Sequence, residues 1–211
     1  MGRQKMRELL EGTNVARKSR FIAFDGMDRA GKTTVISAIA DDLSVRGSSF
    51  IKASGGMLRD TRVADLYGKF PDEIVYMWFW QSHRLLDIEI ITPALEADQI
   101  ILCDRYMLSN MAFNFWTDLD PAFQNQMAQI YIKRCILPDL QFIFIAPYTT
   151  FKERDDGDTV LDEANYNRIM STYLEWGRRL ELEGTTVQVI DGSMPVQVVY
   201  DEVLSIIDRE V

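Results

Sequence analysis

Histidine and cysteine are scarce in this 211-residue chain, which has one histidine and two cysteines. The cysteines, Cys103 and Cys135, stand in apolar surroundings without the spacing of a metal site. We therefore expect buried thiols in a reducing compartment, with a disulfide as the disfavoured alternative. No nucleophile pairs with the single histidine, His83, so we interpret it as structural or solvent-facing.

Long apolar runs and excess positive charge are also lacking. No segment approaches the length of a membrane span, and the first residues have no apolar stretch of the secretory kind, so we expect a cytoplasmic protein without a membrane partner. The net charge is −9, from 23 Lys and Arg residues against 32 Asp and Glu residues. Because nucleic-acid surfaces need many cationic contacts to phosphates, no nucleic-acid partner is expected.

One compact domain accounts for most of the chain. Residues 1–19 form a basic extension, and residues 20–211, within a chain of 47% apolar composition, suffice for one core. Apolar strands are predicted from residue 21 up to the glycine-bracketed turn, and at residues 49–53, 100–103, 140–145 and 186–190. Helical patterns follow the first strand up to Gly47 and cover residues 72–97, where Pro93 should kink or break the helix, 165–183 and 196–207. This alternation predicts an α/β fold of three layers, with a five-stranded parallel sheet between helices.

A phosphate-binding motif joins the first strand to the first helix. Gly26, Gly31, Lys32 and Thr33 satisfy the pattern G-x-x-x-x-G-K-[ST], which presents backbone amides to a polyanion. The glycines permit close approach, Lys32 contributes charge to the β- and γ-phosphates, and Thr33 offers a hydroxyl to Mg²⁺. The predicted ATP-binding residues are Gly26, Asp28, Arg29, Ala30, Gly31, Lys32, Thr33 and Thr34.

A second charged segment follows the strand at residues 100–103. Asp104 is placed as a carboxylate that reaches Mg²⁺ or its waters, and Arg105 could hold a second phosphate. The alternative is an Asp–Arg pair that only caps a helix or stabilises a loop. We expect the functional role, because ligands of parallel sheets bind at the carboxyl ends of the strands.

Together these segments closely resemble the thymidylate kinase family. The resemblance is carried by residues 24–34, by Asp104-Arg105-Tyr106, by residues 91–95, by residues 137–140 and by a helix containing Asn167-Arg168, and it extends over roughly residues 20–209. It implies a P-loop kinase with a lid segment that transfers phosphate from Mg-ATP to a pyrimidine deoxynucleoside monophosphate, with dTMP first among the acceptors. It also implies a homodimer.

The resemblance assigns roles to individual residues. Arg29, Lys32, Asp104 and Arg105 would be catalytic, with Arg29 acting on the γ-phosphoryl group from within the phosphate loop, and Thr33 and Asp104 would serve the metal. Asp28 would face the acceptor's sugar hydroxyl. Trp80 would stack on the base and Arg84, one turn later on the same helix, would donate to it, although aromatic runs in helices are more often core. The implied acceptor-binding residues are Asp28, Arg59, Trp80, Arg84, Arg105, Ser109, Asn110, Phe113 and Asn114, with Arg62 as a rival of Arg59.

The lid segment, residues 149–158, departs from the bacterial-type pattern. Three aspartates follow Lys152 and Arg154, and they would repel ATP if brought near it. This agrees with Arg29 as the catalytic arginine, and leaves Lys152 and Arg154 as secondary candidates. An ordinary solvated loop is the alternative.

Some residues are also compatible with other functions. A deoxynucleoside kinase would need a carboxylate base after the first strand, which Asp25 could supply, but the Asp104-Arg105-Tyr106 context favours a monophosphate acceptor. A GTPase is disfavoured because the chain has no N-K-x-D motif. A non-catalytic nucleotide-binding module remains open. So does the acceptor's base, because Trp80, Asn110 and Asn114 could suit dTMP, dUMP or hydroxymethyl-dUMP, with a purine deoxynucleotide less favoured.

Overall fold

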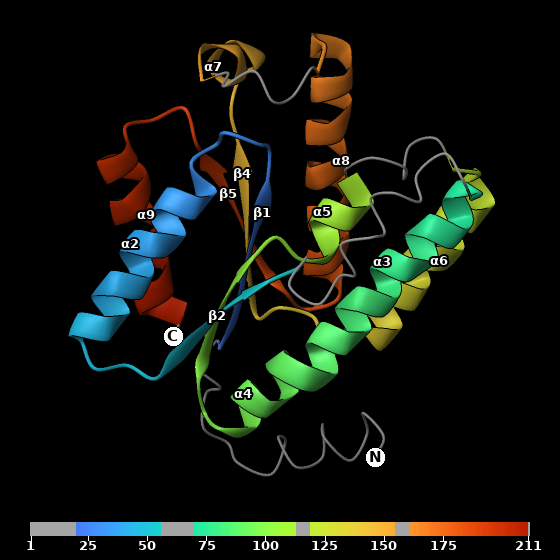
Figure 1. Cartoon of the computed structure of the whole chain (residues 1–211). Coiled ribbons are helices and arrows are strands. Elements are labelled where there is room, and N and C mark those ends of the chain that lie inside the picture. The colour runs from blue at the N-terminus through green and yellow to red at the C-terminus, as the bar shows by residue number, and fades with distance from the viewer. Residues whose placement is uncertain (1–19, 56–69, 113–118, 155–160, 211) are drawn as a thin grey trace.

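A computed structural model of the chain describes residues 20–55, 70–112, 119–154 and 161–210. A parallel sheet lies between two layers of helices (Figure 1). The predicted extension, residues 1–19, lies outside the described residues. No helix in the described part of the chain is both long and apolar enough to cross a bilayer.

The sheet has five parallel strands in the order β2-β3-β1-β4-β5. Their bounds are β1 Phe21–Gly26, β2 Phe50–Ser54, β3 Ile100–Asp104, β4 Leu140–Ile145 and β5 Thr186–Asp191. All six residues of β1 are buried. A central parallel strand is covered on both faces, so a continuous apolar run is what it requires.

Helices α2 (Lys32–Val45) and α9 (Val196–Glu210) cover one face of the sheet (Figure 1). The other face carries α5 (Met107–Ala112) and α8 (Glu163–Leu182), with α3 (Asp72–Leu86) and α6 (Pro121–Arg134) outside them. Short helix α7 (Tyr148–Glu153) follows β4. This confirms the predicted three-layer α/β fold.

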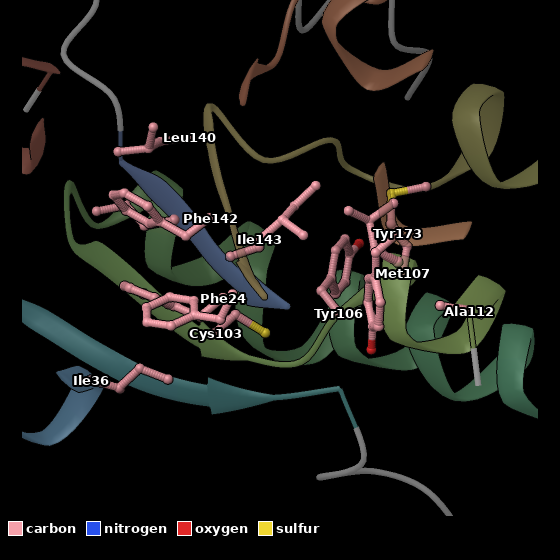
Figure 2. Close-up of a cluster of buried hydrophobic side chains, with 14 of the residues drawn as sticks. Phe24, Ile36, Cys103, Tyr106, Met107, Ala112, Leu140, Phe142, Ile143 and Tyr173 are labelled. Atoms are coloured by element: carbon pink, nitrogen blue, oxygen red, sulfur yellow. The ribbon is translucent and has the colours of Figure 1, made fainter. Parts of the chain in front are cut away.

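The core lies on both sides of the sheet (Figure 2). Phe24 stacks on Phe142 with 5.2 Å between the ring centroids, on the side of α2 and its Ile36. Met107 and Tyr173, from α5 and α8, lie on the opposite side. Cys103 and Cys135 are buried free thiols, as predicted.

The long helical segment before β3 is interrupted ahead of its proline. Helix α3 passes into one π-helical turn, η2 (Asp87–Ile91), and then into α4 (Thr92–Glu96). Pro93 has no amide hydrogen and its ring crowds the carbonyl four residues earlier, so the preceding turn widens. The Thr92 amide accordingly bonds to the Asp87 carbonyl, five residues back.

Three helices between β3 and α8 were not predicted, namely α5, α6 and α7. Helix α6 has a signal that could have found it: Asp120 accepts hydrogen bonds from the Ala122 and Phe123 amides, ahead of which Pro121 occupies the first turn. The other two have six residues each, too short for a periodic pattern. Because α7 covers residues 148–153, the first half of the predicted lid is helix rather than solvated loop.

Candidate functional site

The phosphate loop turns sharply between β1 and α2. Gly26 has φ 130°, and a Cβ on it would lie 2.1 Å from the Phe144 carbonyl oxygen of β4. Gly31, at φ 85°, precedes the first residue of α2. Both positions need glycine, because a side chain would be strained at Gly31 and would strike backbone at Gly26. The loop therefore leads directly to the free amides of a helix N-terminus, as an anion site requires.

Lys32 is the most constrained cation of the loop. Its side chain is buried, and Nζ donates to the carbonyl oxygens of Gly26 at 3.1 Å and Met27 at 2.5 Å. Burial, and next the repulsion of Arg105, lower the pKa of the Lys32 ammonium to about 8. Lys32 therefore remains mostly protonated at neutral pH, and a polyanion beside it would strengthen that state.

Thr33 and Asp104 meet where the loop faces the end of β3. Thr33 Oγ1 donates to Asp104 Oδ2 at 3.2 Å. Asp104 Oδ1 is buried and has no hydrogen-bond partner among the described residues. A hydroxyl beside a carboxylate with an unused oxygen is the kind of donor set that Mg²⁺ takes near phosphates. The predicted metal residues are thus brought together and fit the ion.

Arg105 joins the end of β3 to the phosphate loop. It has φ 61°, pairs with the Asp28 carboxylate and donates to the Gly26 carbonyl oxygen at 3.2 Å. Its guanidinium also lies 3.4 Å from Ser109 Oγ. Asp28 and Arg105, predicted separately from two motifs, are therefore direct neighbours.

Asp25 is part of a buried hydrogen-bond network. Its Oδ1 accepts from the Tyr106 amide at 3.0 Å, the Ser109 amide at 2.9 Å and Ser109 Oγ at 2.5 Å, while Oδ2 accepts from Gln141 at 3.1 Å. Tyr173 Oη lies 3.0 Å from the same hydroxyl. This full set of donors favours a structural carboxylate over a general base at Asp25. Ser109 belongs to this network as well.

The segment after β4 contacts the phosphate loop at Arg29, which has φ 61°. The Arg29 guanidinium lies 4.6 Å from the centroid of the Phe151 ring on α7. Arg154, at the end of α7, donates to the carbonyl oxygens of Arg29 at 2.8 Å and Gly192 at 2.9 Å. The beginning of the predicted lid thus lies against the phosphate loop.

Residues of the phosphate loop, together with Arg105 and Arg154, line one cleft of about 510 Å³. Asp28, Arg29, Lys32, Arg105 and Arg154 lie along its charged part. The rest of the described lining is Ala30, Gly31, Thr33, Thr34, Val35, Gly192, Met194, Val196 and Val199. Sequence reasoning missed the last four, which follow β5. Their position in the sequence could have indicated them, because they come just after the carboxyl end of a parallel strand, where ligands bind. Lys152 is exposed on α7 and is not among the described lining residues.

The predicted base-binding residues lie apart from this described cleft. Trp80 and Arg84 share α3, as expected, and Trp80 is half-buried, with a buried Nε1 that has no hydrogen-bond partner in the described part of the chain. Arg84 is paired with Asp87 at 2.6 Å and donates to the Arg134 carbonyl. Asn110 donates to Tyr131 Oη at 2.8 Å. Contact of these residues with a base stays a prediction.

Other predicted positions have different outcomes. His83 is buried, with Nδ1 2.9 Å from the Phe79 carbonyl oxygen and 3.1 Å from the Asn110 amide nitrogen. It is therefore structural, and the solvent-facing alternative is wrong. Three predicted acceptor residues lie outside the described residues, namely Arg59, Phe113 and Asn114, and so does Arg62, the rival of Arg59.

Comparison with known proteins agrees with this geometry. The family model for thymidylate kinase matches residues 24–203. The thymidylate kinase of Cupriavidus necator is 27% identical to the chain over 202 residues, covering 90% of the chain and 98% of the relative. That of Limosilactobacillus fermentum is 31% identical over 180 residues, covering 76% of the chain and 82% of the relative. That of Nitrosomonas eutropha is 22% identical over 205 residues, covering 91% and 94%.

Proposed function

The chain belongs to the thymidylate kinase family of nucleoside monophosphate kinases, and on that premise we propose that it transfers the γ-phosphoryl group of Mg-ATP to a pyrimidine deoxynucleoside monophosphate, with dTMP as the first candidate. One observation carries the proposal. Four cationic side chains, Arg29, Lys32, Arg105 and Arg154, line a single cleft in a chain whose net charge is −9. Such a local concentration of positive charge suits a site for two phosphorylated substrates.

The donor nucleotide fits the phosphate loop. Backbone amides at the start of α2 and the Lys32 ammonium would hold its β- and γ-phosphates. Thr33 and Asp104 would hold Mg²⁺, which supplies neutralising charge to those phosphates when bound. Beyond the loop, Met194 and Val196 line the cleft and are 45% and 55% exposed. These two side chains provide an apolar surface on which the base of ATP could bind.

The acceptor is expected on the Arg105 side of the cleft. Arg105 is paired with Asp28, and an incoming phosphate would attract the same guanidinium. Asp28 would then be released to accept a hydrogen bond from the acceptor's sugar. Arg59, Trp80, Arg84, Ser109, Asn110, Phe113 and Asn114 remain the proposed acceptor residues.

The proposed reaction requires alignment and neutralisation more than proton transfer. A nucleoside monophosphate is already ionised at neutral pH, so its phosphate oxygen can attack without a general base. Arg29, Lys32 and Arg105 would offset the repulsion between two polyanions and stabilise charge on the transferring group. This agrees with the buried, non-catalytic surroundings of the single histidine, His83.

We also propose a homodimer in the cytoplasm. Helix α3 and the following turn expose Ile74, Met77, Leu85 and Ile88, which are 40–55% accessible. Their spacing puts them on one helix face, which a second copy of the chain could cover.

A coupled ADP-release assay with Mg-ATP tests the proposal. The acceptor panel is dTMP, dUMP, hydroxymethyl-dUMP, dCMP, UMP, dGMP and dAMP, with thymidine as the control for a nucleoside kinase. We expect turnover with dTMP and at most slow turnover with thymidine. Preference for another pyrimidine would change the substrate within the class. ATP binding without turnover of any acceptor would overturn the proposed reaction in favour of a nucleotide-binding module.

A further inference from the structure

Both ends of Arg29 are held by the segment that follows β4. Its carbonyl oxygen accepts a hydrogen bond from Arg154 at 2.8 Å, and its guanidinium lies 4.6 Å from the centroid of the Phe151 ring. Arginine has many rotamers, and those of an arginine in a solvent-facing loop would be widely populated. The contact with Phe151 selects among them.

The Phe151 ring is itself rigidly placed. It is 1% exposed and forms a cluster of three rings with Tyr148 and Tyr166, whose centroids lie 6.0 Å and 5.1 Å from its own and 5.5 Å from each other. Tyr166 Oη donates to the Ala146 carbonyl oxygen at 2.8 Å, which ties this aromatic group to the end of β4. The ring is therefore fixed relative to the sheet, and a guanidinium in contact with it is fixed relative to the sheet as well.

An aromatic ring suits this task better than a carboxylate would. A carboxylate would neutralise the guanidinium and compete with a phosphate for its N–H groups. The face of a ring attracts the cation through its quadrupole and carries no net charge that would neutralise it. Arg29 can thus be held in place while it keeps its charge for a phosphate.

The geometry points to Phe151 as a positioning residue for Arg29. Phe151 is buried and is not among the described residues that line the cleft, so it acts through Arg29, whose guanidinium it restricts to the arrangement that meets the γ-phosphoryl group. This inference rests on the proposed function. The contact with Phe151 orders the Arg29 side chain before the reaction starts, so this entropy cost does not add to the activation barrier. Loss of the contact should therefore lower kcat and leave the KM for the acceptor nearly unchanged.

Graded fluorination of Phe151 tests the role without changing the shape of the core. Replacing the phenylalanine by its 4-fluoro, trifluoro and pentafluoro analogues weakens the ring quadrupole in steps. We expect kcat for dTMP to fall in the same order, to about 2- to 30-fold below wild type for the weakest ring, as a cation–π contact predicts. Phe151→Tyr, which keeps the ring face, should retain most of the activity.

The matched control is a second cation–π pair. On α8, the Arg179 guanidinium lies 4.2 Å from the centroid of the Trp176 ring, and Arg179 is also paired with Glu175. Fluorinated Trp176 should leave kcat unchanged. In an Arg29→Ala background, fluorination of Phe151 should also have no effect, because the partner cation is gone.

Two outcomes would overturn the role: activity that is insensitive to fluorination, or equal sensitivity with and without Arg29. ATP affinity, measured by calorimetry across the same series, separates this inference from the proposed reaction. Affinity that falls with fluorination while no acceptor is turned over would reject the reaction and retain the positioning role. Flat ATP affinity together with absent turnover would reject both.

Discussion

Positive charge in the cleft is held in place by neighbours of different kinds. Lys32 is bound by two carbonyl oxygens, Arg105 by the Asp28 carboxylate and Arg29 by an aromatic ring. Of these three contacts, the one between Arg105 and Asp28 pairs a cation with an anion. A phosphate that binds Arg105 therefore has to compete with the Asp28 carboxylate.

Loss of the Arg29 side chain should lower the rate more than it lowers acceptor binding. We expect Arg29→Ala to reduce kcat by about 10²–10³-fold, the loss typical of a transition-state charge partner. Arg29→Gly should show the same loss of kcat, and glycine adopts the positive φ at this position more easily than alanine does. Steady-state kinetics provide the measurement. Arg179→Ala, on the surface of α8, is the control, and an unchanged kcat would remove Arg29 from the proposed role.

Asp87 should make stability depend on pH in a predictable direction. It is 1% exposed, and burial raises the pKa of its carboxyl to about 6, despite hydrogen bonds from Tyr106, Ile136 and Arg84. The native state thus keeps this proton at a pH where the unfolded chain has released it. As pH rises from about 4 to about 6, the free energy of unfolding should therefore fall by an amount on the order of 1–3 kcal/mol.

Asp87→Asn removes this titration. Urea unfolding at several pH values should therefore show that the free energy of unfolding of the wild type declines relative to the variant between pH 4 and pH 6, and runs parallel above that range. Glu89→Gln, at an exposed position on the same turn, should follow the wild type. Parallel curves for wild type and Asp87→Asn throughout would contradict the proposed protonation of Asp87.

The residues of the phosphate site could largely be predicted from the sequence. Lys32 and Thr33 follow a loop whose spacing fixes their geometry, and Asp104 ends a buried strand whose neighbour is β1. The roles of Phe151 and Gly192 could not be predicted, because each acts through a contact with the loop from a segment more than 120 residues later. No local pattern encodes such a contact.

Among the elements, the strands were more predictable than the helices between them. A buried parallel strand needs an apolar run, and the run at residues 140–145 has the predicted bounds. The break in the long helical segment was also predicted, although it lies one turn ahead of Pro93 because the ring acts on the preceding carbonyls. Helices α5 and α7 are short, and tertiary packing rather than periodicity determines them.

The turn after β5 should control the shape of the phosphate loop. A Cβ at Gly192 would lie 2.3 Å from the Ala30 carbonyl oxygen. Gly192→Ala should therefore displace the loop and lower kcat/KM by about 10²-fold, the usual effect of a shift of about 1 Å in a site. Steady-state kinetics and calorimetric ATP titration would measure it.

Gly184→Ala, at the other end of β5, is the matched control. Gly184 has φ 96° but open space around it, so alanine there should cost about 1 kcal/mol of stability without changing ATP affinity. Equal ATP affinity for Gly192→Ala and wild type would show that the loop tolerates the contact.

At the scale of the whole molecule, the exposed apolar face of α3 should govern association. In a symmetric dimer each substitution counts twice. Met77→Glu, at a position 50% exposed, should raise the dimer dissociation constant by about 100-fold, corresponding to about 1.4 kcal/mol per copy. Sedimentation velocity would follow the change. Leu182→Glu, at a position 87% exposed on α8, should not alter it, and an unchanged dimer for Met77→Glu would place the interface elsewhere.

The central place of β1 has a consequence for the nascent chain. Its partners are β3 and β4, with Phe21 opposite Ile101 and Ile22 opposite Leu140. At about 5–20 residues per second, a ribosome completes β4 about 6–24 s after β1. Until then β1 can pair with β3, which is made earlier, but has no neighbour on its β4 side, and a holding chaperone should bind its apolar residues during synthesis. Silent codon changes that slow translation between residues 30 and 140 should therefore increase aggregation without altering the finished enzyme.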